Sequence, residues 1–230
     1  MFAISRFVRA CTFVFERTGT LNPHWWRHAM LFRMGCLLAL VAPFSVSAHV
    51  MAPPAAVQVC AGCHGMQGAG SATGIPRIAG MNADYLAHAL AMFKAGTRAS
   101  DVMQPIAKTL SDTDIDVLAH YFATQHPPLA PASPPSLDLV TAGKTLAVHG
   151  GDNGVAACFQ CHAANGIGNG QRFPSIAGEP AAFVVNRLHE FQARARTGVP
   201  KPGSMTEVAS RLTEEQIHAA AAYLSVIPPG

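Results

Sequence analysis

Two copies of the pattern Cys-x-x-Cys-His constrain this chain more than any other feature of its sequence. Residues 60–64 (CAGCH) and 158–162 (CFQCH) lie 98 positions apart, and the residues around them also repeat. Twelve residues after each histidine begins a second shared segment, at 76–80 (PRIAG) and 174–178 (PSIAG). Because two separate motifs agree at one offset, we interpret the chain as a tandem duplication of about 100 residues.

The repeat continues towards the end of each copy and leaves a distinct spacer between the copies. Residues 103–110 (MQPIAKTL) correspond to 205–212 (MTEVASRL) at an offset of 102, so the second copy has four extra residues. The spacer contains five prolines, which disfavour a helix and favour an extended chain. We therefore predict a first domain at 49–126, a proline-rich linker at 127–135 and a second domain at 136–230.

The secondary structure expected from the sequence is helical throughout. Ser111 and Asp114 have the spacing of a helix capping box, and apolar residues then recur at helical intervals as far as Phe122. The second copy repeats this pattern from Thr213. No segment shows the alternation of a convincing strand. Further helices are expected over 82–95, 136–148 and 180–195. The predicted fold class is therefore all-α.

The first 48 residues differ in character from the rest and predict export. A basic flank ends at Arg33, the run 35–46 (GCLLALVAPFSV) is uncharged and mostly apolar, and small residues follow at 46–48. An apolar run of about 12 residues is too short for a transmembrane helix, which takes about 20. We predict that residues 1–48 are an N-terminal extension plus a signal peptide, removed on export to the periplasm. The alternative is an uncleaved membrane anchor.

Removal of that segment changes the charge of the protein. It contributes five of the 16 Lys and Arg residues and one of the 13 Asp and Glu residues, which leaves 11 basic and 12 acidic side chains. The mature chain is therefore almost neutral, and no nucleic-acid surface is expected. Four of the six cysteines remain, as two pairs, in a compartment where disulfides usually form.

The histidine that follows each pair favours haem attachment over the other uses of paired cysteines. Two thiols about one turn apart can form thioethers with the vinyl groups of haem, and the adjacent imidazole can bind the iron. A disulfide does not require that histidine. A structural zinc site needs four ligands, and neither copy has further cysteines. A thioredoxin-like dithiol is typical of a βαβ setting, which this chain lacks. We therefore predict two covalently bound haem c groups.

A second axial ligand decides whether the iron is open to a substrate. Met205 is the only methionine of the second copy, and the duplication aligns it with Met103. Met66, Met81 and Met92 are rivals in the first copy, but none has a methionine counterpart in the second. The alternative is that these methionines merely fill the core. His/Met ligation closes the iron and raises its reduction potential, which suits electron transfer better than catalysis.

Pro76 and Pro174 have an expected role beside the haem histidines. The carbonyl group of a residue at this place can accept the proton on the outer imidazole nitrogen, which fixes the ring and tunes the metal. The alternative is an ordinary turn proline.

Together these motifs resemble the dihaem class I cytochromes c, and the cytochrome c4 family in particular. The resemblance covers about residues 55–228 and implies two cytochrome c folds packed about a pseudo-twofold axis. It also implies a periplasmic carrier between redox proteins, with a quinol-oxidising complex or dehydrogenase as donor and a terminal oxidase as acceptor. Peripheral association with a membrane is compatible with it. The implied site residues are Cys60, Cys63, His64, Met103 and Pro76 for one haem, and Cys158, Cys161, His162, Met205 and Pro174 for the other.

The chain departs from the family pattern in three respects, one of which is the loop before Met205, longer by four residues. Little sequence precedes Cys60, so the first helix of the first copy is expected to be short. Met81 and Glu179 stand where the family often has glutamine. These departures concern the contact between domains and the partner surface, whereas the haem motifs are intact.

Two other functions compete with the free electron carrier. Dihaem peroxidases and thiosulfate-oxidising cytochromes also contain two Cys-x-x-Cys-His patterns, but they need an open or unusually ligated iron. The second competitor is a fixed cytochrome subunit of a membrane dehydrogenase. The paired methionines favour a carrier, so we expect no enzymatic activity of its own.

Overall fold

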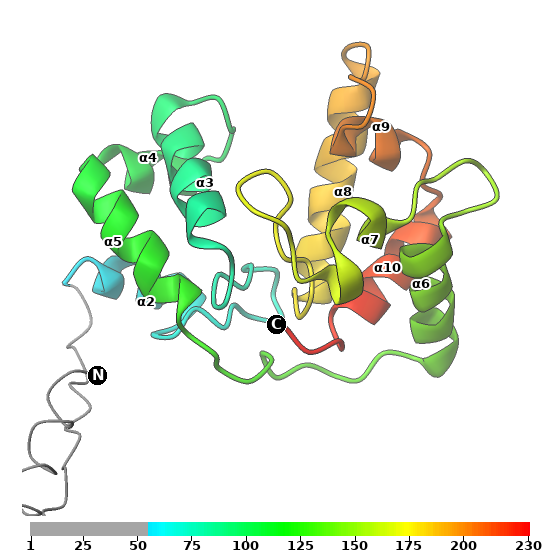
Figure 1. Ribbon diagram of the computed structural model, residues 1–230, viewed down its shortest axis with the longest axis horizontal. Helices are drawn as coiled ribbons and strands as arrows, with labels where there is room; N and C mark the ends of the chain where they lie inside the picture. Colours follow the sequence, from blue (N-terminus) through cyan, green and yellow to red (C-terminus); the bar gives the residue numbers. More distant parts are fainter. Residues whose placement is uncertain (1–54) are drawn as a thin grey trace, which may run out of the picture. The chain divides into compact units, whose positions relative to one another are not determined.

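The computed structural model describes residues 55–230, and these residues belong to one compact unit (Figure 1). The predicted extension and signal peptide at 1–48 lie outside the described residues. Within the described part, the chain forms helices joined by turns and loops, and its β-type pairings are three isolated bridges. The predicted all-α fold class is therefore confirmed. None of the helices between residues 55 and 230 combines the length and the apolar character needed to cross a bilayer.

The helices fall into two groups that follow the two sequence copies (Figure 1). The first copy contains α2 (Val57–His64), α3 (Ala83–Ala95), α4 (Met103–Lys108) and α5 (Asp112–Ala123). The second contains α6 (Leu137–His149), α7 (Cys158–Cys161), a 3-10 helix (Ala164–Gly166), α8 (Ala181–Arg196), α9 (Met205–Ser210) and α10 (Glu214–Leu224).

Side-chain caps mark the starts of α3, α5, α6 and α10. The side chain of Ser111 accepts the backbone N–H of Asp114, and the carboxylate of Asp114 accepts the backbone N–H of Ser111. Thr213 and Gln216 form the same reciprocal pair at the start of α10. Asn82 caps α3 through its side-chain oxygen. Each cap supplies acceptors for N–H groups that the first turn leaves without a helical partner.

Each copy has its own hydrophobic core. In the first copy, Leu86 of α3 packs with Leu118 and Phe122 of α5 and with Val57 of α2. In the second, α6, α8, α9 and α10 contribute a separate cluster that is centred on Ile217, which is fully buried. No residue belongs to both clusters. The separation of the cores supports the two-domain organisation that we infer from the repeat.

The crossing of α6 and α10 in the second copy depends on a glycine. A Cβ atom on Gly143 of α6 would lie 2.0 Å from the carbonyl oxygen of Ala219 in α10. Only a residue without a side chain lets the two backbones approach so closely. This contact holds the first and last helices of the copy together, and the loop with the second Cys-x-x-Cys-His pattern lies between them in sequence.

The proline-rich spacer has no helix or strand from residue 125 to residue 136. The guanidinium group of Arg77 donates hydrogen bonds to the carbonyl oxygens of Pro127 and Pro128, at 2.9 and 3.2 Å. Because this segment lies outside any helix or strand, these carbonyl groups can accept hydrogen bonds from a side chain. We propose that residues 127–135 link the two domains and that Arg77 fixes the start of the linker.

Candidate functional site

The first Cys-x-x-Cys-His pattern lies on α2. Cys60 is half-buried and packs against the core of the first copy, whereas Cys63 is exposed. Neither forms a disulfide, and burial raises the pKa of the Cys60 thiol above its usual value. The two sulfur atoms are one helical turn apart, so both are available to one planar group beside the helix.

The two cysteines of the second pattern lie on α7, a helix of four residues, and His162 follows directly. As in the first copy, one cysteine is half-buried and the other is exposed. Cys158 packs against the core of its copy, and burial raises the pKa of its thiol to about 11. Cys161 is exposed, and neither of these cysteines forms a disulfide. The two copies approach the pattern differently, because α2 runs straight through it while α6 ends at His149 and a loop leads into α7.

Both histidines of the patterns are buried and held by the same contact. Nδ1 of His64 lies 2.9 Å from the carbonyl oxygen of Pro76, and Nδ1 of His162 lies 2.7 Å from that of Pro174. A carbonyl only accepts, so each Nδ1 bears the proton and each Nε2 keeps its lone pair. Burial lowers the pKa of both imidazoles. A neutral, oriented imidazole with a free Nε2 is the form that binds a metal.

A tight turn brings each proline back to its histidine. In both copies an isolated bridge closes the turn, between Ser71 and Ile75 and between Asn169 and Phe173. Gly70 precedes the first bridge with a φ of 77°, and a Cβ atom there would lie 2.5 Å from the carbonyl oxygen of Ile75. The left-handed backbone and the close approach both require glycine at this position.

The two aligned methionines occupy equivalent places. Met103 is the first residue of α4, and Met205 is the first residue of α9. Both are partly buried, and Met205 packs against the same core cluster as Cys158. Of the rivals in the first copy, Met81 is buried in the core and Met66 is 45% exposed. The sequence did not predict these two short helices, which both begin at the aligned methionine.

Known proteins match this chain along both copies. The family described as "Cytochrome C oxidase, cbb3-type, subunit III" matches residues 55–122 and 149–224. The "Thiosulfate dehydrogenase electron acceptor" of Thiomonas intermedia (strain K12) is 37% identical over 179 residues, which are 77% of this chain and 82% of that protein. Cytochrome c4 of Azotobacter vinelandii is 34% identical over 193 residues, with 77% of this chain and 90% of that protein covered.

A solved structure agrees with these relatives. The crystal structure of reduced recombinant cytochrome c4 from Pseudomonas stutzeri superimposes with a TM-score of 0.66 at 32% identity, covering 74% of this chain and 94% of that one. The chain belongs to the cytochrome c4 family of dihaem cytochromes c. It therefore binds two covalently attached haem c groups and belongs to a family of electron carriers.

A buried donor in this cytochrome fits a haem group. The Nε atom of Arg98 is buried and has no hydrogen-bond partner among the described residues. Its guanidinium lies over the ring of Phe93, 4.5 Å from the centroid, and donates to the hydroxyl of Tyr85 at 3.4 Å. A buried N–H without an acceptor is costly, so an anionic group such as a haem propionate is a suitable partner.

One important contact of this cytochrome was missing from the sequence analysis. Glu179 of the second copy is only 3% exposed, and its Oε2 accepts the backbone N–H of Arg77 in the first copy at 2.9 Å. The sequence did contain a sign of it, because an acidic residue follows the glycine of the second repeat where the first repeat has Met81. The pairing itself could not be predicted, since the partners are 102 residues apart.

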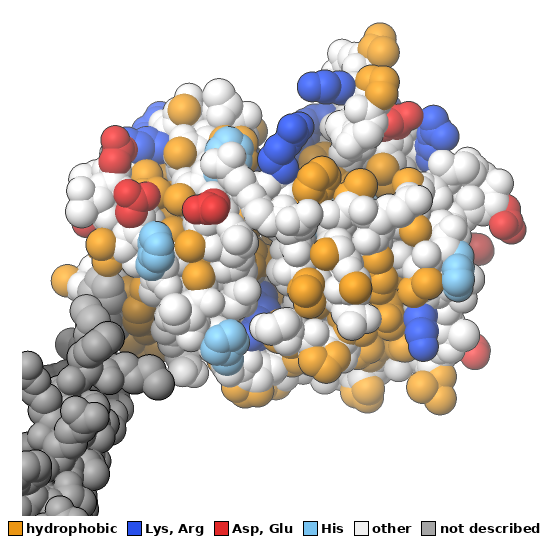
Figure 2. Space-filling model, viewed as in Figure 1, with side chains coloured by type: hydrophobic (Ala, Val, Ile, Leu, Met, Phe, Trp, Pro, Cys, Tyr) orange, Lys and Arg blue, Asp and Glu red, His pale blue; other side chains and the backbone are white. Residues whose placement is uncertain are grey.

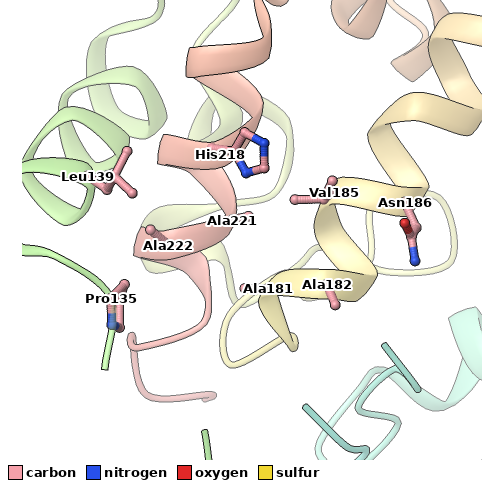
Figure 3. A pocket seen from close by; sticks show the side chains of 9 residues that line it. All are labelled: Pro135, Leu139, Ala181, Ala182, Val185, Asn186, His218, Ala221 and Ala222. Atoms are coloured by element: carbon pink, nitrogen blue, oxygen red, sulfur yellow. The ribbon is translucent and has the colours of Figure 1, made fainter. Parts of the chain in front are cut away.

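The cytochrome also has an apolar surface pocket of about 420 Å³ between α6, α8 and α10 (Figure 3). Its lining includes Leu139, Val185 and His218, whose side chains converge on it from the three helices. Hydrophobic side chains are widely exposed over the second copy in the space-filling view (Figure 2). None of the lining residues belongs to a Cys-x-x-Cys-His pattern, and neither Met103 nor Met205 lines the pocket. The pocket is therefore separate from the haem motifs.

Proposed function

We propose that this protein is a diffusible dihaem electron carrier in which both irons have histidine and methionine as axial ligands. The observation that supports it is the repeated geometry of two buried histidines, each with Nδ1 hydrogen-bonded to a proline carbonyl. The proposed residues for the first haem are Cys60, Cys63, His64, Met103 and Pro76. Those for the second haem are Cys158, Cys161, His162, Met205 and Pro174.

The residues of each site have separate tasks. The two cysteines anchor the ring as thioethers, so the group cannot dissociate. The proline carbonyl fixes the imidazole ring and increases its basicity as a ligand. The methionine sulfur would be the second protein ligand of the iron and would stabilise its reduced form. When bound in this way, haem supplies one-electron redox chemistry at a raised potential.

The proposed electron donor is a dehydrogenase, and a thiosulfate dehydrogenase fits best. The name of the Thiomonas relative, "Thiosulfate dehydrogenase electron acceptor", supports this choice. A second relative with that name, from Stutzerimonas stutzeri (strain A1501), is 33% identical over 176 residues. A quinol-oxidising complex is the competing donor, and a terminal oxidase is the proposed acceptor in both cases. The proposed location is the periplasm, with peripheral membrane association at most.

The paired methionines also argue against enzymatic activity. If a histidine and a methionine both bind each iron, no site would remain for peroxide or thiosulfate, so we propose that the protein relays electrons and does not oxidise substrate itself. A dihaem enzyme requires at least one site without such a ligand. A fixed dehydrogenase subunit would share the same sites, and it differs only in remaining bound to its complex.

The donor is tested by mixing the oxidised protein with candidate enzymes and their substrates. We expect a purified thiosulfate dehydrogenase with thiosulfate to reduce both haems rapidly, as followed by stopped-flow absorbance, and thiosulfate alone to reduce neither. Faster reduction by a quinol-oxidising complex with quinol would reassign the donor. Turnover of peroxide or thiosulfate by the protein alone would overturn the carrier function, and retention on a membrane complex at high salt would favour a fixed subunit.

A further inference from the structure

The peptide group between Pro76 and Arg77 is hydrogen-bonded on both of its sides. Its carbonyl oxygen lies 2.9 Å from Nδ1 of His64, and its N–H donates to Oε2 of Glu179 at 2.9 Å. His64 belongs to the first copy and Glu179 to the second. A carboxyl group of one domain is therefore connected to the proposed haem ligand of the other by a single peptide group.

The carboxyl group of Glu179 is directed to this peptide in a fully buried setting. The guanidinium group of Arg77, which is 2% exposed, donates to the carbonyl oxygens of Ala79, Pro127 and Pro128. The carboxyl group of Glu179 accepts the peptide N–H of Arg77 through Oε2. Burial raises its pKa to about 8, against the lowering effects of the N–H bond and of the charges of Arg77 and Arg98. His126 and the C-terminal Gly230 lie beside the nearby Gly80.

The second copy does not repeat this arrangement. Ser175 stands at the position of Arg77, and Met81 stands at the position of Glu179. Met81 is buried within the core of the first copy and has no oxygen to offer the peptide N–H of Ser175. Any effect of the carboxyl group on a histidine ligand is therefore specific to the first haem.

We propose that Glu179 is a positioning residue that lowers the reduction potential of the first haem through the Pro76–Arg77 peptide. This inference rests on the proposed role of His64 as an iron ligand. An acceptor on a peptide N–H polarises the group and increases the electron density at its carbonyl oxygen. The stronger acceptor draws the Nδ1 proton, so the imidazole becomes a more basic ligand and favours the oxidised iron. The effect is greatest when the carboxyl group is ionised.

The test compares the intact dihaem protein with its Glu179→Gln variant at pH 9, above the pKa of the carboxyl group. Glutamine keeps the shape and an amide oxygen that can accept the same hydrogen bond, but it removes the charge. Both potentials are measured by redox titration, with each haem followed through its own NMR methyl signals. We expect the equilibrium constant for reduction of the first haem to rise about tenfold, which is 59 mV for one electron, and the second to change much less.

Glu190→Gln is the matched control, because it removes a carboxylate of the same copy from the exposed face of α8. We expect both potentials to remain close to those of the parent protein. Glu179→Met, which copies the residue of the first repeat, removes the acceptor as well as the charge and should raise the first potential at least as much. Thermal unfolding of each variant shows whether the fold is retained.

The outcomes separate this inference from the proposed function. Equal shifts of both haems, or no shift in either Glu179 variant, would overturn the tuning role while leaving the carrier function intact. A folded parent protein whose first haem lacks the spectrum of His/Met ligation would overturn the proposed site instead. A variant with unchanged potentials but lower thermal stability would make Glu179 a purely structural residue.

Discussion

Gly143 of α6 meets the backbone of Ala219 in α10 so closely that no side chain fits between them. A Cβ atom on the glycine would lie 2.0 Å from the Ala219 carbonyl oxygen and 2.7 Å from the Cβ of Tyr223. The two helices hold the second copy together on either side of its Cys-x-x-Cys-His loop. The stability of the second domain should therefore depend strongly on this one residue.

We predict that Gly143→Ala destabilises the second domain by about 1–3 kcal/mol, because the backbones must move apart to admit the methyl group. Denaturant unfolding, followed by haem absorbance, measures the change. Gly198→Ala is the control, since Gly198 lies in the same copy, has no left-handed φ, and an added Cβ there meets nothing within 4 Å. The control should be neutral or more stable by up to about 1 kcal/mol. Equal effects of the two substitutions would contradict the close crossing.

We predict that Met205→Ala opens one iron to external ligands and lowers its reduction potential, because the thioether sulfur is lost. Half of the long-wavelength absorption typical of methionine-ligated ferric haem should disappear, and one equivalent of carbon monoxide or cyanide should bind. Met103→Ala should do the same at the other haem. Met66→Ala, at an exposed methionine, should leave the spectrum unchanged. An unaltered spectrum in the Met205 variant would mean that another group binds the iron.

We predict that Cys158→Ser costs one covalent haem while the first domain keeps its own. The reason is that the two hydrophobic cores share no residue, so the first copy has its own packing around Cys60. Mass spectrometry of the purified variant counts the attached haems, and circular dichroism reports the remaining helix. Loss of both haems would show instead that the two domains fold only together.

We predict that Glu179 makes the protein less stable as the pH rises. Burial raises the pKa of its carboxyl group from about 4.5 in the unfolded chain to about 8 in the folded protein. Between these values the folded state binds the proton more tightly, so its stability falls with rising pH and levels off above pH 8. The expected loss is a few kcal/mol.

Urea unfolding of the parent protein and of Glu179→Gln at pH 5 and pH 8.5 measures this contribution. The variant should lose most of the difference between the two pH values, because glutamine does not titrate in this range. Asp114 is a carboxyl group with the opposite behaviour, because hydrogen bonds from Ser111 lower its pKa. It should therefore stay ionised at both pH values and contribute nothing to the difference between them. A pH dependence that persists unchanged in the Glu179 variant would assign it to other groups.

Much of the fold followed from local patterns. The capping boxes at Ser111 and Thr213 marked the starts of α5 and α10, because a cap is a contact between residues three positions apart. The two six-residue helices α4 and α9 escaped detection, since so short a segment shows too little periodicity. Pro105 lies within the first turn of α4, where proline is tolerated.

The sequence by itself determined the duplication, the all-α class, the covalent haem groups and the residues expected to hold them, because each depends on residue type and spacing along the chain. Only the tertiary structure decided that Arg77 donates hydrogen bonds to the carbonyl oxygens of Pro127 and Pro128 and that Glu179 is buried against the Pro76–Arg77 peptide. That contact joins residues about 100 positions apart, and its energy depends on exclusion from water. A local sequence pattern encodes neither a contact over that separation nor its exclusion from water, so only the packing of the two copies reveals the Glu179–Arg77 hydrogen bond.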